Sequence, residues 1–77
     1  MGKIKVTTKS TMSLIANEID VNAEFIMLHI AKEQYCLSTM LNCSIAFECN
    51  LTIDNNEYRL ELPVDCIYSL EHISETK

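Results

Sequence analysis

Four cysteines and two histidines have the side chains that most often serve as nucleophiles, general bases or metal ligands: Cys36, Cys43, Cys49, Cys66, His29 and His72. No two cysteines form a C-x-x-C pair, and the cysteines and histidines do not have the spacing of a zinc site. Cys36 with His29 is the best available pair for nucleophilic catalysis, but no local signature selects it. Because Gly2 is the single glycine, a glycine-rich phosphate loop is excluded. The sequence therefore predicts a protein that is not an enzyme and holds no metal and no cofactor.

The start of the chain, MGKIKVTTK, lacks the apolar core of a signal peptide. No apolar run approaches the ~20 residues that span a bilayer. Without secretion a disulfide framework is not expected, so we expect the cysteines to be reduced, buried thiols. These features predict a soluble, cytoplasmic protein that does not act on a membrane.

Length and charge restrict the fold and the partners. The 77 residues allow a single domain over 1–77, with a core at 3–72 and a frayed tail at 73–77. Eleven acidic residues against six Lys and Arg give a net charge of −5. The chain lacks the basic stripe that nucleic-acid binding normally requires, so we expect no nucleic-acid partner. A chain this short buries only about 60% of its unfolded surface, so a homodimer would stabilise it.

The stretch CSIAFECNLTI, residues 43–53, alternates apolar and polar side chains and predicts a β-strand. Its odd positions are apolar, and its even positions place Glu48, Asn50 and Thr52 on a polar face. Asn55 and Asn56 suit a two-residue hairpin loop, because asparagine tolerates the positive φ of a type I′ turn. The resulting register pairs Ile53 with Tyr58, Leu51 with Leu60, Cys49 with Leu62, Thr52 with Arg59, and Asn50 with Glu61.

The rest of the chain predicts further short elements. FIMLHIA at 25–31 indicates a central strand with His29 as a hydrogen-bonded structural residue, and 3–7 a first strand whose lysines protect an edge. Residues 10–24 fit a helix or a strand, 36–41 a short strand, and PVDCIYSLEHI at 63–73 a short helix. We therefore expect a mainly β, α+β fold, a small five- or six-stranded antiparallel barrel or sandwich with one or two short helices.

Three segments in this order resemble the peptide-binding core of the SspB (stringent starvation protein B) family, adaptors of the ClpXP protease. FIMLHIA is similar to that family's I-V-L-N-I-A strand, through Ile26, Leu28, Ile30 and Ala31. Asn42, Ile45 and Phe47 match its N-D-x-I-x-F-N-A-R-F strand, and Pro63 matches its V-x-V-P segment. The resemblance spans roughly residues 3–72.

The resemblance implies a compact β-rich domain, related in shape to SH3 and Sm barrels, that binds degradation-tag peptides in a groove. Members of the family dimerise through an N-terminal helix and reach ClpX through a long tail. This chain starts at the first strand and stops at Lys77, so neither part is expected here. It also carries Asn50 where the family strand has an arginine near the peptide groove.

Two functions follow as hypotheses. The first is a peptide- or protein-binding adaptor module, with an extended peptide lying along the polar face of 43–53 beside the 32–37 connection. The second is a small acidic inhibitor or accessory subunit, of the kind mobile elements encode, that blocks a larger enzyme. Alignment with the family groove predicts the following partner-binding residues: Glu33, Gln34, Glu48 and Asn50.

Overall fold

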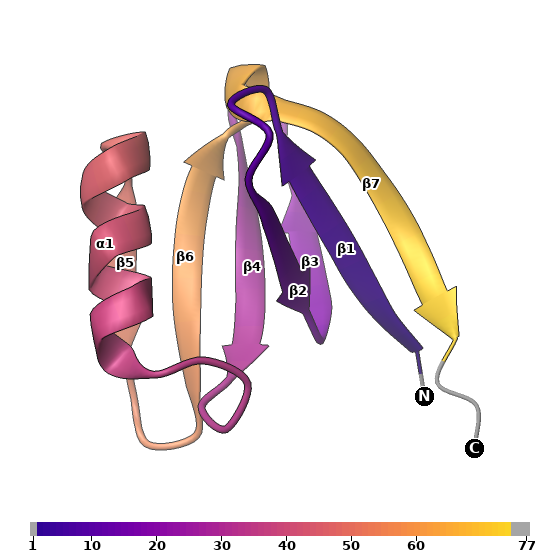
Figure 1. Cartoon of the computed structure of the whole chain (residues 1–77). Helices are drawn as coiled ribbons and strands as arrows, with labels where there is room; N and C mark the ends of the chain where they lie inside the picture. The colour runs from indigo at the N-terminus through magenta and orange to yellow at the C-terminus, as the bar shows by residue number, and fades with distance from the viewer. Residues whose placement is uncertain (1, 75–77) are drawn as a thin grey trace.

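The computed structural model describes residues 2–74 and contains seven strands, one α-helix and one short 3-10 helix (Figure 1). The mainly β, α+β class is confirmed, with one or two more strands than expected. The elements, in chain order, are β1 (Gly2–Thr8), β2 (Ser13–Ala16), β3 (Glu18–Val21), β4 (Phe25–Ala31), α1 (Leu37–Phe47), β5 (Asn50–Ile53), β6 (Glu57–Pro63), η1 (Val64–Cys66) and β7 (Ile67–Ser74).

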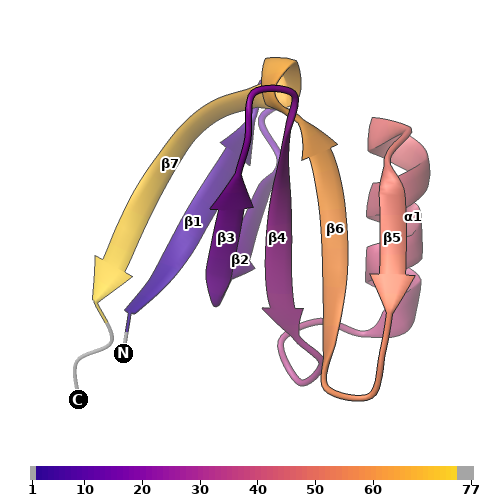
Figure 2. The same cartoon turned by 180° about the vertical axis from the view of Figure 1, so that it is seen from behind.

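The strands form two antiparallel sheets. One has the order β2-β1-β7 and the other the order β3-β4-β6-β5. The chain makes β1 and β2, crosses to the larger sheet for β3 to β6, and returns with β7 to pair with β1. Figure 2 shows the larger sheet from its outer side, where no other element covers it.

The core lies between the two sheets and extends under α1. Alternation buries one side of each central strand: Ile26, Leu28 and Ile30 on β4 face the same interior as Leu60 and Leu62 on β6. The smaller sheet contributes Ile4 and Val6 on β1 and Leu14 and Ala16 on β2 to this core, and α1 contributes Met40 and Cys43.

The expected strand over 43–53 is wrong for its first half. Residues 37–47 form α1, and only Asn50–Ile53 form a strand. Met40, Cys43 and Phe47 have the i, i+3, i+7 spacing of one helical face, and it is this face that packs on the core. Ile45, which a strand would have buried beside Cys43, is 74% exposed. The short strand expected at 36–41 is likewise the start of α1.

The hairpin is confirmed from Asn50 onward, but the expected type I′ turn is wrong, because Asn55 and Asn56 do not have positive φ. The backbone N–H of Asp54 donates to the carbonyl of Glu57 over 3.1 Å, closing the two-residue loop. One carboxylate oxygen of Asp54 also accepts from the N–H groups of Asn56 and Glu57, each over 2.9 Å. The ladder between β5 and β6 has the predicted register from Ile53 opposite Tyr58 to Asn50 opposite Glu61, but it does not extend to Cys49 and Leu62.

Several other expectations can be compared with the structure. The strand at 25–31 is confirmed as β4, between β3 and β6, and the first strand is confirmed as β1. The role of β1 as an edge is wrong, because β2 and β7 flank it on both sides. Residues 10–24 contain the two strands β2 and β3.

The short helix expected at 63–73 is also wrong. Pro63 does end β6, but only Val64–Cys66 turn, as η1, and Ile67 begins β7. β7 forms because β1 offers it a full-length antiparallel partner sixty residues earlier in the chain, with Ile4 opposite His72 and Val6 opposite Leu70. Ile73 and Ser74, expected in a frayed tail, belong to this strand; residues 75–77 lie outside the described part.

No helix within residues 2–74 has the length and apolar character needed to cross a membrane. The longer of the two, α1, has 11 residues.

Candidate functional site

The outward side of the larger sheet forms a continuous polar surface. The inward residues of β4 and β6 are buried, so strand alternation turns their neighbours outward. Cross-strand pairing then assigns the residues of β3 and β5 to the same side. We call this surface the outer face; it is formed by Glu18, Asp20, Met27, His29, Asn50, Thr52, Glu57, Arg59 and Glu61.

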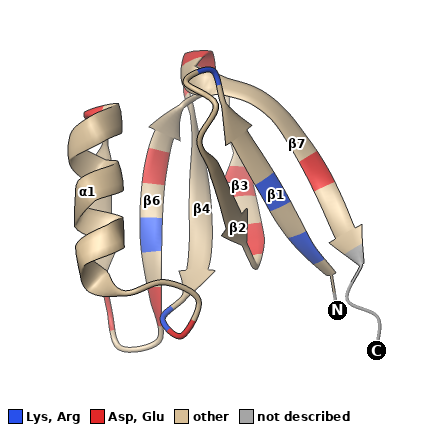
Figure 3. Cartoon of the chain, viewed as in Figure 1, with Lys and Arg blue, Asp and Glu red and all other residues tan. Residues whose placement is uncertain are grey.

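The outer face is mainly acidic. It carries four carboxylates, and its opposing side chains are Arg59 and the imidazole of His29. Figure 3 shows the acidic positions on β3 and β6 with the single basic position of β6 between two of them. The four carboxylates outnumber the two basic side chains, so positive charge on a covering molecule would be electrostatically complementary to this face.

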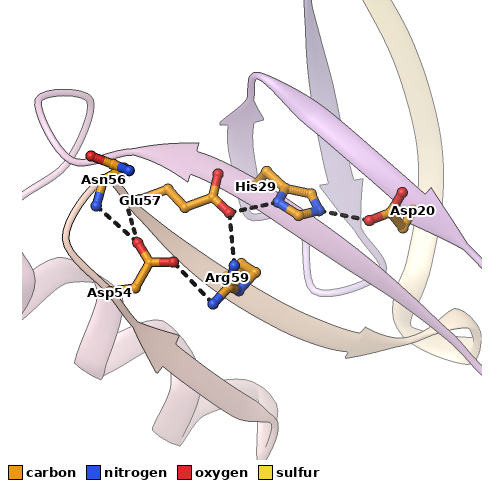
Figure 4. A network of polar contacts seen from close by, with 6 residues as sticks. All are labelled: Asp20, His29, Asp54, Asn56, Glu57 and Arg59. Atoms are coloured by element: carbon orange, nitrogen blue, oxygen red, sulfur yellow. Dashed lines mark hydrogen bonds and ion pairs between the residues drawn. The ribbon is translucent and has the colours of Figure 1, made fainter.

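A chain of ionic contacts crosses the outer face from β3 to the β5–β6 turn (Figure 4). His29 Nε2 lies 2.7 Å from Asp20 Oδ2, and His29 Nδ1 lies 2.8 Å from Glu57 Oε2. Arg59 then donates to Glu57 Oε2 over 3.2 Å and forms an ion pair with Asp54 Oδ2 at 3.0 Å. This network fixes the side chains of one end of the face in a defined arrangement.

The network favours the charged form of His29. Burial of the ring lowers its pKa, but the hydrogen bonds to Glu57 and Asp20, together with their negative charge, outweigh this and raise the pKa above 6.5. Only a doubly protonated imidazole can donate to both carboxylates at once. The contacts agree with the expected structural role of His29, and they leave neither ring nitrogen free to accept a proton from another molecule.

The other end of the outer face contains a groove of about 270 Å³. We call it the acidic groove. Its lining combines three carboxylates with two apolar rings: Glu24, Glu48 and Glu61 with Phe25 and Pro63. Asn50 also lines it and donates from Nδ2 to Glu61 Oε1 over 2.9 Å, which fixes the orientation of that carboxylate. The groove can hold an elongated side chain with an apolar stem and a cationic end.

Glu48 reaches the groove because α1 ends there. Its backbone adopts a left-handed conformation, with φ 52° and ψ 48°, and its N–H donates to the carbonyl of Ile45 over 3.2 Å. This conformation turns the chain from α1 into β5 and places Glu48 beside Asn50.

The structure divides the four predicted site residues into two pairs. Glu48 and Asn50 lie together in the acidic groove, although Glu48 caps a helix instead of sharing a strand face with Asn50. Glu33 and Gln34 follow the last residue of β4, at the opposite end of that strand (Figure 1). Seven strand residues separate the two ends, about 20 Å. Gln34 accepts a hydrogen bond from Lys3 Nζ over 3.1 Å.

Sequence reasoning missed several residues of the face. Glu61 and Arg59 were placed correctly opposite Asn50 and Thr52, but not as part of a charged surface. Asp20 and Glu57 were missed because their association with His29 depends on strand pairing across the sheet. Alternation in FIMLHIA was the available signal, since it turns His29 to the polar side.

The four cysteines are all free, and one of them, Cys49, lines the acidic groove. The expected burial holds for Cys43, while Cys36 is exposed and the other two are half-buried. Hydrogen bonds to Ser38 and Thr39 lower the pKa of the Cys36 thiol to about 7, whereas burial raises the pKa of Cys49 to about 11. Cys36 and His29 have different partners, and within residues 2–74 no group of three or more His, Cys, Asp or Glu is arranged to hold a metal ion.

No protein-family model, no curated protein and no solved structure matches this chain. The resemblance to the SspB family therefore depends on the sequence pattern. Its first element lies on β4 and its third at the end of β6. Its second element, a strand in that family, lies on α1 through Asn42, Ile45 and Phe47.

Proposed function

We propose that this protein is a non-catalytic protein-binding module whose outer face docks a basic segment of a partner protein. The observation that carries the proposal is the uncovered sheet face, on which four carboxylates face two basic side chains (Figures 2 and 3). Docked cations would neutralise this excess and would be attracted to the face before contact.

The acidic groove supplies a specific anchor point within that face. A lysine or arginine stem would lie against Phe25 and Pro63, and its charged end would reach Glu48 or Glu61. An extended segment of about seven residues that begins in the groove and follows β4 would reach the connection after that strand, which holds Glu33 and Gln34. We call this path the track; because Gln34 is bound to Lys3 of the smaller sheet, a segment that contacts Gln34 must turn around the end of β4.

Both functional hypotheses use this face. An adaptor, as the SspB resemblance implies, would bind a short extended peptide along the track. A small acidic inhibitor or accessory subunit would cover a basic surface of a folded enzyme. The spread of carboxylates from β3 to β6, well beyond the groove, supports the second hypothesis, and the groove supports the first.

The docking proposal is tested with a fluorescent decapeptide of alternating lysine and alanine, followed by anisotropy at about 50 mM salt. We expect Glu61→Lys to weaken binding about tenfold. Glu71→Lys, an exposed position of β7 on the other sheet, changes the net charge equally and should have less than about a twofold effect. Equal effects of the two variants would contradict a site on the outer face.

A second measurement separates the two hypotheses. In the adaptor hypothesis, Gln34→Ala weakens binding of the decapeptide but not of a four-residue lysine–alanine peptide too short to leave the groove. In the inhibitor hypothesis, Gln34→Ala changes neither affinity, and Glu61→Lys abolishes co-purification of a folded partner from the native cell.

A further inference from the structure

Four strands lie at sheet edges within residues 2–74, and three of them are protected. β3 carries Glu18 and Asp20, and β7 carries Glu71 and a register irregularity at its start. The edge of β2 is capped by a side chain, because the hydroxyl of Tyr35 accepts from the backbone N–H of Ile15 over 2.9 Å. Charge, bulges and covering groups are the usual protections against strand addition.

β5 lacks each of these protections. Its sequence, Asn-Leu-Thr-Ile, contains no charged residue and no proline, and among the described residues β6 is its single strand neighbour. Asp54 and Glu57 form a hydrogen-bonded pair at the turn. Because hydrogen-bonded and non-hydrogen-bonded pairs alternate along the ladder, the backbone N–H and C=O groups of Asn50 and Thr52 point toward β6. The backbone groups of Leu51 and Ile53 therefore point to the free edge.

An exposed apolar stripe on α1 accompanies this edge. Leu37, Leu41 and Ile45 follow one another at intervals of four and are 45%, 45% and 74% exposed. They lie on the flank of α1 that includes Ser44, whose hydroxyl donates to the carbonyl of Cys49 just before β5. The opposite flank, through Ala46 and Phe47, lines a groove with the β1–β2 turn.

The segment 37–53 is also almost free of charge, with Glu48 as its single ionisable acid or base other than cysteine. The 11 residues of α1 include no Lys, Arg, Asp or Glu, and Figure 3 shows the helix in tan except for red at its C-terminal end, where Glu48 follows. Two chains of net charge −5 can approach each other through this segment at the lowest electrostatic cost.

The geometry points to a second copy of this chain as the occupant of this surface, which we call the α1–β5 edge. The two β5 strands pair antiparallel about a twofold axis at Thr52, and the two larger sheets become one sheet of eight strands. Leu51 of each copy then faces Ile53 of the other as a hydrogen-bonded pair, which uses all the edge groups identified above. Both outer faces lie on the same side of the joined sheet.

Dimensions and charge are consistent with this dimer. α1 contacts both β5 and β6, so the two helices would lie about 10 Å apart, an ordinary helix packing distance. The nearest charged strands, the two copies of β6, would be three strand spacings apart, about 14 Å, which exceeds the Debye length of about 8 Å. A standard interface takes about 800 Å² from each partner, roughly a sixth of the 4949 Å² surface.

Disulfide trapping tests the register. In the Cys36→Ser background, which removes the exposed native thiol, we expect Thr52→Cys to form a covalent dimer under mild oxidation. The two Cα atoms would be about 4.5 Å apart, within the disulfide range of about 4.4–6.8 Å. Asn50→Cys is the matched control on the same strand, because its two copies would be about 14 Å apart.

Analytical ultracentrifugation tests the helix contribution without a new cysteine. The wild type should sediment with twice the 8.8 kDa chain mass. Ile45→Asp should weaken the dimer at least about tenfold, and Asn42→Asp, exposed on the opposite flank of α1, less than about threefold. A wild-type monomer at several hundred micromolar, equal effects of these two variants, or equal trapping at positions 50 and 52 would overturn the inference. None of these results depends on peptide binding, so the proposed function fails or stands separately.

Discussion

The outer face and the α1–β5 edge are both exposed, adjoin at β5, and differ in almost every other property. The outer face is charged, and its side chains are held by cross-strand ion pairs such as Arg59 with Glu57 and Asp54. The α1–β5 edge carries apolar side chains on a helix without a charged residue, and these side chains contact solvent. In our proposals, one surface docks a basic partner and the other accepts a second copy of the chain.

The difference between the two surfaces follows from one strand hairpin. β6 has buried leucines on one side and Glu57, Arg59 and Glu61 on the other, whereas β5 has the uncharged Asn50 and Thr52 on its outward side. The acidic charge therefore stops one strand before the edge. A single hairpin thus separates the surface proposed to bind a partner from the surface proposed to self-associate, and the following changes test that separation.

The largest effect is expected from Leu60→Ala, which removes the support that both surfaces share. Leu60 is fully buried between Leu28 on β4 and Leu51 on β5. The cavity should lower the free energy of unfolding by about 2–5 kcal/mol, a large part of the stability of a small domain. Urea unfolding followed by circular dichroism measures it. Leu70→Ala, at a 41% exposed position of β7, should cost less than about 1 kcal/mol; equal losses would contradict the assigned core.

A smaller, pH-dependent effect is expected from Glu57→Gln, which disrupts the ionic network on the outer face and does not change the α1–β5 edge. The pKa of His29 is raised in the folded state, so the stability from its charge is complete below pH 6.5 and is lost as pH rises through the folded pKa. The free energy of unfolding of the variant should be about 1–2 kcal/mol lower than that of the wild type at pH 6, and this difference should become smaller at higher pH. Part of it persists because Glu57 also binds Arg59.

The measurement for Glu57→Gln is urea unfolding at several pH values, with an NMR titration of His29 in both proteins. The pKa of His29 should fall in the variant. The matched control is Glu33→Gln, in the exposed connection after β4, which should change neither quantity. A difference that grows with pH would show that the imidazolium is not stabilised by this carboxylate.

The sequence predicted those features that depend on neighbouring residues. The position of the turn at Asn55 and Asn56 and the register from Ile53 to Asn50 required only local alternation and the preference of asparagine for turns. The turn type was not predicted, because neither asparagine has positive φ. β4 was predicted for the same reason. β7 was not, because its strand conformation depends on pairing with β1 at the other end of the chain, and the local pattern of PVDCIYSLEHI equally fits a helix.

α1 shows why alternation alone misled the prediction. Cys43 and Phe47 are four residues apart, a spacing that fits both a strand face and a helical face, so Ile45 is the residue between them that distinguishes the two. In the structure Ile45 is exposed, the reverse of the strand interpretation, and Met40, which precedes the predicted strand, is buried on the helical face. Glu48 and Asn50 nevertheless both line the acidic groove, because α1 ends at Phe47 and β5 begins at Asn50. The contacts of Asp20 could not be predicted in this way, because they depend on the order of the strands in the sheet.

Glu48 lies at the junction of the two surfaces, and Glu48→Gly should separate their properties with the smallest change in stability. Its φ of 52° is strained for an L-residue and natural for glycine, so the variant should gain about 0.5–1 kcal/mol. The acidic groove loses one carboxylate, so binding of the lysine–alanine decapeptide should weaken. The α1–β5 edge keeps its apolar side chains, so self-association should not weaken. Glu48→Ala is the control, since it removes the carboxylate but keeps the strain: it should bind the peptide as weakly as Glu48→Gly without the gain in urea-unfolding free energy. Equal stability of the two variants would mean that the left-handed turn is not what ends α1.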